Sequence, residues 1–225
     1  MNKYWRPIQN FTILGFREPE IKLKDNFRFE TMGDNLDDST PWHQALTPYF
    51  KTISDDYFFL AFEDHFLIDY VNIGLFNEAE NIIKNDKTIG KVRLLPKYGQ
   101  NDPQQIKIYN GNFYESIETT AQCSTTSLRP SIWRKDFFIK LLNNTNIKSP
   151  HHFEVVNLGK AFSQRVILPK GNDPVFPDLD AMRKGSPNAA ATKDGLINAG
   201  YYSLNLKEED LGVFQSVKKK WNSRG

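Results

Sequence analysis

The chain contains a single cysteine, Cys123, which rules out a disulfide within the chain and therefore a fold held together by disulfides. It also has little net charge, because 29 Lys and Arg are balanced by 27 Asp and Glu. Its aromatic residues are not interleaved with basic residues, as a stacking platform for single-stranded nucleic acid requires. Dedicated nucleic-acid binding is therefore not expected.

Long hydrophobic runs are missing as well. No apolar stretch approaches the roughly 20 residues of a membrane-spanning helix, and the N-terminal sequence MNKYWRPIQN lacks the apolar segment of a signal peptide. With one cysteine, this favours a cytoplasmic protein. The basic sequence SVKKKW near the C-terminus allows at most peripheral contact with a membrane. A length of 225 residues predicts one domain that spans 1–225.

The order of the expected elements predicts an α/β fold with a mostly parallel sheet flanked by helices. Apolar runs and alternation predict strands at 11–16, 26–34, 57–62 and 91–95, and helical spacing predicts helices from Pro41 and over 73–84. Residues 96–118 are expected to form a long loop or an irregular hairpin. A helix is expected to begin near Trp133 or Lys135, and the proline-rich last third is expected to be loop-rich.

An acidic pair, Glu63-Asp64, directly follows the apolar run YFFLAF at 57–62. In an open α/β sheet, ligands gather at the carboxyl ends of strands, and carboxylates there suit Mg²⁺ or Mn²⁺. The alternative is structural, in which one carboxylate caps the helix that begins near Ile73 or pairs with a surface lysine.

Two further segments hold candidate residues. Trp133, in SLRPSIWRKDFF, lies at the entry to a helix, where its ring can line a sugar site or fill the core. Glu154, in SPHHFE, is a candidate general base, with a capping box begun by Ser149 as the alternative. The adjacent pair His151-His152 lacks the spacing of a zinc site.

A basic turn follows in DAMRKGSPN. Arg183 and Lys184 stand beside Gly185, where they could clamp a diphosphate while the glycine allows a close backbone approach. The spacing matches neither a Walker A loop nor a dinucleotide-binding fingerprint. An exposed basic turn is the alternative.

Taken in order, DDYFFLAFEDHFLIDYVN, KVRLLP, SLRPSIWRKDFFIKLL with SPHHFE, and DAMRKG resemble a family of bacterial and viral GT-A-type glycosyltransferases of surface-polysaccharide clusters. The resemblance covers roughly residues 40–190. It implies a GT-A-like sheet and transfer of a sugar from a nucleotide-sugar donor to a saccharide or lipid-linked acceptor.

The resemblance also implies a role for each matching residue. Asp64 and Glu63 would hold a divalent metal, Mn²⁺ or Mg²⁺, on the donor diphosphate, which makes Asp64 part of the catalytic set. Glu154 would take the proton from the acceptor hydroxyl. The substrate-binding residues would be Trp133, Arg129, Arg183 and Lys184. This reading requires Asp64, Glu154 and Arg183 to meet in one cleft.

Two features depart from the family pattern. The opening sequence, MNKYWRPIQNFTILGF, corresponds to the second strand region, so a shortened nucleotide pocket is expected. The acidic motif is Glu-Asp followed by His65, without the spaced Asp-x-Asp common in the superfamily. Two other functions therefore stay open: a catalytically inactive GT-A-like accessory protein, and a metal-dependent phosphotransferase or nuclease with three or more clustered acids.

Overall fold

A computed structural model describes residues 3–33, 42–62, 65–96, 105–117, 126–143, 153–154, 164–171, 174–180, 182–183 and 186–187. Three helices have their bounds here: α1 (Trp42–Thr52), α2 (Ile73–Asn85) and α3 (Lys135–Leu142). The central strands are β3 (Tyr57–Leu60), β5 (Ile89–Arg93), β6 (Gln105–Ile108), β7 (Phe113–Ile117), β8 (Ser131–Arg134) and β9 (Arg165–Pro169). Three small strand pairs are β1 (Phe11–Gly15) with β2 (Phe27–Thr31), β4 (His65–Leu67) with β10 (Asp178–Asp180), and β11 (Met182–Arg183) with β12 (Ser186–Pro187).

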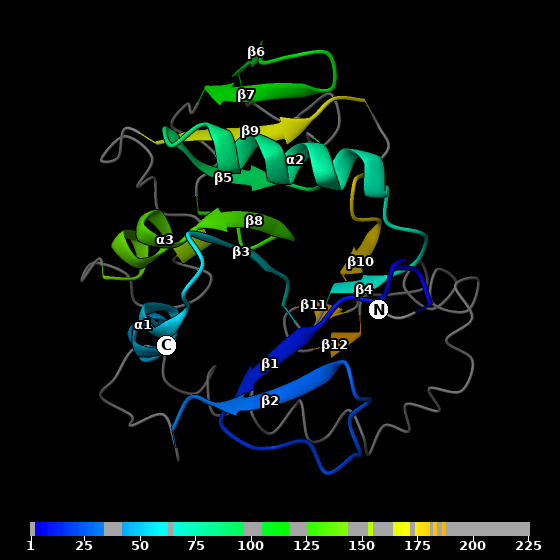
Figure 1. The fold of residues 1–225 in the computed structure, drawn as a ribbon, viewed down its shortest axis with the longest axis vertical. Coiled ribbons are helices and arrows are strands. Elements are labelled where there is room, and N and C mark those ends of the chain that lie inside the picture. Colours follow the sequence, from blue (N-terminus) through cyan, green and yellow to red (C-terminus); the bar gives the residue numbers. More distant parts are fainter. Residues whose placement is uncertain are drawn as a thin grey trace.

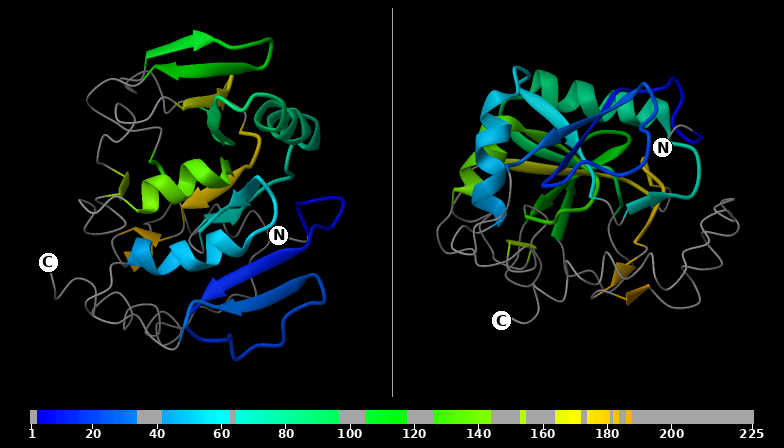
Figure 2. Two further views of the ribbon diagram at one scale, coloured as in Figure 1. Left: turned by 60° about the vertical axis from the view of Figure 1, so that its left-hand side comes forward. Right: turned by 90° about the horizontal axis from the view of Figure 1, so that it is seen from below.

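The central sheet has six strands in the order β3-β8-β5-β9-β7-β6. Only β5 and β9 pair in parallel, and the other four pairings are antiparallel. The α/β class is confirmed, but the expected mostly parallel sheet is wrong. The reason is that two parts of the sheet run opposite to their neighbours. One is β8, which was not predicted as a strand. The other is the β6–β7 hairpin, which was one of the two alternatives expected for 96–118. The β6–β7 hairpin and the β1–β2 pair lie at opposite ends of the molecule (Figures 1 and 2).

The two faces of this sheet carry separate apolar cores. On β8, Ile132 belongs to one cluster, with Ile83 of α2, while its neighbour Trp133 belongs to the other, with Phe137 of α3. Because successive side chains of a strand point to opposite faces, helix α2 covers one face and α3 covers the other. Helix α1 packs beside α3 through Phe50, which is buried in the second cluster.

Among the described residues up to 95, every predicted strand and helix is present, but β4 was not predicted, and neither was the strand before α3. The helix begins at Lys135, the later of the two expected starts, and Trp133 lies inside strand β8. The strand is formed because β8 lies between β3 and β5 and bonds to both. These are partners that a local pattern does not reveal.

Candidate functional site

The carboxyl end of β3 lies against the start of β8. Ser131 pairs with Leu60 of β3 on one side and with Arg93 of β5 on the other. The amide of His65 donates to the carbonyl of Phe62 at 3.2 Å, so the two residues that flank the acidic pair are one hydrogen bond apart. Glu63 and Asp64 themselves lie outside the described residues. The residues on either side of the pair, Phe62 and His65, therefore lie at the edge of the sheet where β3 ends.

A distant part of the chain crosses the same edge. The amides of Val175 and Phe176 both donate to the carbonyl of Leu94, which directly follows β5, at 2.9 and 3.2 Å. The amide of Ile68 donates to the carbonyl of Pro177 at 3.0 Å. These bonds position the residues that directly precede β10, and β10 pairs with β4.

His65 and Asp178 meet where β4 and β10 pair. His65 Nδ1 is hydrogen-bonded to Asp178 Oδ2, and the two side chains are 9% and 1% exposed. The guanidinium of Arg129, which is 26% exposed, lies 3.9 Å from the same oxygen. The other oxygen, Oδ1, is buried and has no hydrogen-bond partner among the described residues. Sequence reasoning missed Asp178, although its spacing in Asp178-Leu179-Asp180 is an Asp-x-Asp signal.

Glu154 is anchored to the segment that leads into β8. Its Oε1 accepts a hydrogen bond from the amide of Leu128 at 2.9 Å, and its carbonyl accepts one from the hydroxyl of Thr126 at 3.2 Å. Arg129 is the residue after Leu128, so the structure brings Glu154 and Arg129 into one local unit. The alternative capping role, with Ser149, lies outside the described residues.

Trp133 is fully buried and packs against Phe138 with ring centroids 4.8 Å apart. The ammonium of Lys91, also fully buried, lies 4.2 Å from the centroid of the indole and donates to the carbonyl of Ser127 at 2.5 Å. Core packing was the alternative left open for Trp133, and that is where the structure places its side chain. Its predicted contact with a sugar has no support from this position.

The basic turn is described only in part. The backbone of Arg183 lies in β11, three residues after the last residue of β10, and pairs with Ser186. Lys184 lies outside the described residues. A clamp on a diphosphate by these two residues therefore stays a prediction.

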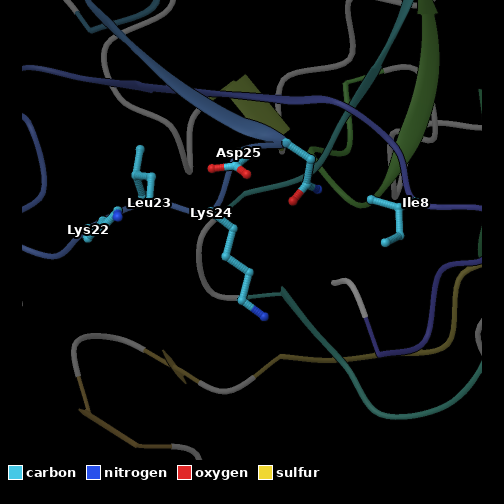
Figure 3. Close-up of a pocket in the computed structure, with 6 residues that line it drawn as sticks. Ile8, Lys22, Leu23, Lys24 and Asp25 are labelled. Atoms are coloured by element: carbon cyan, nitrogen blue, oxygen red, sulfur yellow. The ribbon is translucent and has the colours of Figure 1, made fainter.

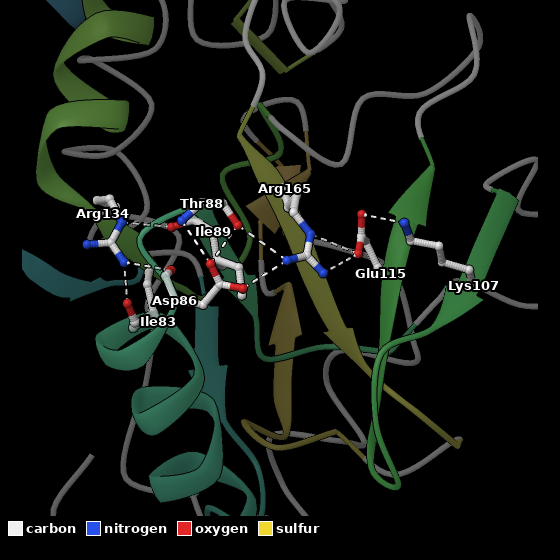
Figure 4. A network of polar contacts seen from close by, with 8 residues as sticks. All are labelled: Ile83, Asp86, Thr88, Ile89, Lys107, Glu115, Arg134 and Arg165. Atoms are coloured by element: carbon white, nitrogen blue, oxygen red, sulfur yellow. Dashed lines mark hydrogen bonds and ion pairs between the residues drawn. The ribbon is translucent and has the colours of Figure 1, made fainter.

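The opposite end of the sheet carries a polar network instead (Figure 4). Arg165 joins two carboxylates, with nitrogen–oxygen distances of 2.8 Å to Asp86 and 2.5 Å to Glu115, and Lys107 lies 3.1 Å from Glu115. The hydroxyl and amide of Thr88 both donate to Asp86, and these bonds, followed by Arg165, lower the Asp86 pKa despite partial burial. The network satisfies its own members, which is typical of a structural ion-pair cluster.

A hollow of about 500 Å³ lies elsewhere, next to the turn before β2 (Figure 3). It is lined by Ile8, Lys22, Leu23, Lys24, Asp25 and Asn26. None of the predicted site residues borders it, and its charged groups are exposed lysines with one aspartate. We do not place the candidate site there.

The described residues allow one test of the expected divalent metal. Within them, no group of three or more His, Cys, Asp or Glu could hold an ion. Asp178 nevertheless presents a buried carboxylate oxygen that lacks a donor, next to the histidine that follows the acidic pair. A single carboxylate oxygen is one of the roughly six ligands that Mg²⁺ needs, so the described residues alone do not make up a site for such an ion.

Comparison with known proteins adds no further assignment. The chain matches no protein-family model, and no curated protein is significantly similar to it. Within the described residues, no helix has the length and apolarity needed to cross a membrane.

Proposed function

We propose that this protein is a glycosyltransferase that moves a sugar from a nucleotide-sugar donor to a saccharide or lipid-linked acceptor, in surface-polysaccharide or lipopolysaccharide synthesis. The observation that carries the proposal is the convergence of separate segments at one edge of the sheet. Phe62 and His65, which flank the acidic pair, lie there together with Arg129 and Asp178. Glu154 accepts a hydrogen bond from Leu128, the residue before Arg129. The order of motifs that resembles GT-A enzymes supports the same reading.

Glu154 is suited to act as the base. Leu128 holds Oε1, while Oε2 has no hydrogen bond within the described part of the chain. A carboxylate with one oxygen fixed and the other available can take the proton of an acceptor hydroxyl. The oxygen of that hydroxyl then attacks the anomeric carbon of the donor sugar. The bond from that carbon to the diphosphate breaks, and the diphosphate leaves with the electron pair.

The departing diphosphate needs positive charge. Arg129 is the described cation that lies partly exposed at this edge, and Arg183 and Lys184 would add to it. A divalent metal held by Glu63 and Asp64 would supply charge neutralisation as a Lewis acid. Without such groups the leaving group would carry uncompensated charge in a partly buried site.

A metal-dependent phosphotransferase or nuclease is the second candidate. That function calls for three or more acids around a metal, and Asp178 adds an acid beside the residue that follows Glu63 and Asp64. It differs in what binds, because it needs a phosphate ester and has no need of a sugar nucleotide.

Ligand-induced stabilisation tests the proposal. The full chain is melted with UDP, GDP, CMP or dTDP, each with and without Mn²⁺, since a ligand at 100 times its Kd stabilises the folded state by about 2.7 kcal/mol. One nucleotide is expected to raise the melting temperature. Asp64→Ala is expected to abolish the share of this increase that depends on Mn²⁺. No shift with any nucleotide, in protein that melts cooperatively, would contradict the proposal.

A further inference from the structure

Lys91 is a charged side chain inside the core. It lies in the middle of β5, is fully buried, and pairs with Trp133 on the neighbouring strand β8. Its ammonium donates to the carbonyl of Ser127 at 2.5 Å and lies 4.2 Å from the centroid of the indole. A methionine would fill a similar space without the cost of taking a charge out of water, so packing alone does not explain a lysine here.

The carbonyl that binds Lys91 belongs to the same peptide group as the amide that binds Glu154. A trans peptide group is planar, so its oxygen and its N–H point to opposite sides of one rigid unit. In the Ser127–Leu128 peptide group, the oxygen accepts from Lys91 and the N–H donates to Oε1 of Glu154 at 2.9 Å. Rotation of this plane would weaken both hydrogen bonds at once, and the two side chains are therefore coupled through it.

The charge of Lys91 strengthens this coupling. A cation at the carbonyl oxygen polarises the peptide group, and hydrogen bonds in such a chain strengthen one another. The N–H of Leu128 is therefore a better donor to a carboxylate than an ordinary amide is. The next part of the segment is fixed as well, because the hydroxyl of Ser131 donates to the carbonyl of Arg129 at 2.6 Å.

We propose that Lys91 is a positioning residue for Glu154, whose carboxylate it orients through the Ser127–Leu128 peptide group. The inference rests on the proposed function, in which Glu154 is the base. A base must direct its free oxygen at the acceptor hydroxyl, and a displacement of about 1 Å can cost about 10²-fold in rate. Lys91 is enclosed in the core and acts only through this peptide group.

A double-mutant cycle tests whether Lys91 acts through Glu154. The full chain is compared as wild type, Lys91→Met, Glu154→Gln and the double variant, and the readout is nucleotide release from sugar nucleotides with water as the acceptor. We expect Lys91→Met to lower kcat at least about tenfold and to leave the KM for the donor within about threefold, because only the base is displaced. In the Glu154→Gln background, the same change is expected to alter kcat less than about twofold.

Lys170→Met is the matched control. The ammonium of Lys170 makes a similar pair of contacts, because it donates to the carbonyl of Asn110 at 2.6 Å and lies 5.0 Å from the ring centroid of Tyr114. None of these residues contacts the Ser127–Leu128 peptide group among the described interactions, so kcat is expected to stay within about twofold of the wild type. Cooperative melting of each variant checks the fold.

Hydrogen exchange tests the coupling without turnover. In the wild type, the amide of Leu128 is expected to exchange at least about 100-fold more slowly than that of Gly111, an exposed turn residue whose amide has no hydrogen bond within the described part of the chain. Lys91→Met should speed exchange at Leu128 at least about tenfold, and Lys170→Met should leave it unchanged. If Lys91→Met fails to fold, the wild type still decides, because exchange at Leu128 as fast as at Gly111 would overturn the inference.

The outcomes separate this inference from the proposed function. A kcat that Lys91→Met leaves within about twofold, a loss of equal size in the Glu154→Gln background, or a loss without faster exchange at Leu128 would each overturn the role of Lys91 and leave the glycosyltransferase proposal standing. No nucleotide release by the wild type, with exchange at Leu128 that depends on Lys91, would support the coupling of Lys91 to Glu154 and reject the glycosyltransferase.

Discussion

His65 is hydrogen-bonded to Asp178 across 113 positions of the chain, and both side chains are almost completely buried. This contact joins β4, the strand after the acidic pair, to β10. The carbonyl of Leu94 also accepts hydrogen bonds from the amides of Val175 and Phe176. The segment 175–178 is therefore attached to this edge of the sheet at two places. The candidate site is therefore built jointly by early and late parts of the sequence.

Replacement of Glu154 separates its catalytic role from its structural one. Glu154→Gln keeps an oxygen that can accept from the amide of Leu128, so the fold and nucleotide affinity are expected to persist. Loss of the base is expected to lower kcat about 10²- to 10⁴-fold. Steady-state kinetics measure kcat and KM separately.

Glu154→Ala provides the comparison, because it also removes the acceptor for Leu128. We expect it to lower the free energy of unfolding by about 1–3 kcal/mol relative to Glu154→Gln. Equal kcat in the wild type and in Glu154→Gln would show that Glu154 is only an anchor.

Gly90 lies where β5 meets helix α3. A Cβ there would stand 2.3 Å from Cδ1 of Phe137, and the ring of Phe137 is fully buried. Gly90→Ala is therefore expected to lower the free energy of unfolding by about 1–3 kcal/mol through overpacking. Gly111→Ala is the matched control, since a Cβ there meets nothing within 4 Å. Urea denaturation compares the two, and equal stability would mean that Phe137 can move aside.

Arg165 is expected to make the free energy of unfolding depend on pH in the acid range. Its pKa is raised, first by the hydrogen bond with Glu115. Burial tends to raise the Glu115 pKa, but the bonds from Arg165 and Lys107 outweigh it, so the pKa is lowered. The Asp86 pKa is lowered too. Both carboxylates therefore stabilise the fold at a pH above their ordinary pKa values near 4. This stabilisation is lost as the pH falls through their lower pKa values in the folded protein.

Arg165→Met tests this linkage. The side chain is one-third exposed, so a loss of only about 1–2 kcal/mol is expected at pH 7, and the gap to the wild type should narrow as the pH falls below 4. The control is Arg28→Met, whose guanidinium pairs with Glu30 on the surface and should change stability by less than about 0.5 kcal/mol. A gap that stays constant with pH would contradict the account.

Trp133 is expected to affect stability far more than ligand binding. Its side chain is fully buried between α3 and the ammonium of Lys91. Trp133→Ala should lower the free energy of unfolding by about 3–5 kcal/mol through the cavity it leaves. Trp133→Phe should fold and bind nucleotide as the wild type does. A large loss of nucleotide affinity in folded Trp133→Phe would restore the predicted role at the substrate.

The sequence predicted the local elements better than their partners. Helix α2 was predictable because its apolar residues recur at helical spacing. Its cap was not: the alternative in which Glu63 or Asp64 caps this helix is wrong, because the N-cap is Asn72, whose side chain accepts from the amide of Leu75. The direction of strands was not, since it depends on which strands lie side by side. Strand β8 shows this, because SIWR becomes a strand only between β3 and β5.

The site was predictable in the same uneven way. Glu154 was a candidate from its own segment and Arg129 was implied by the resemblance, and the structure brings them together through Leu128. Asp178 lies far along the chain in a proline-rich region, and nothing local ties it to His65. Only the pairing of β4 with β10 reveals the contact.

Nucleotide release from intact donors tests the central claim most directly. The purified chain is incubated with UDP-, GDP-, CMP- and dTDP-sugars, with water standing in for the acceptor, and the free nucleotide is measured by chromatography. Our account predicts release from one donor class, slowed at least 100-fold in Glu154→Gln. No release from any donor by folded protein, or release that is unchanged in Glu154→Gln, would contradict it.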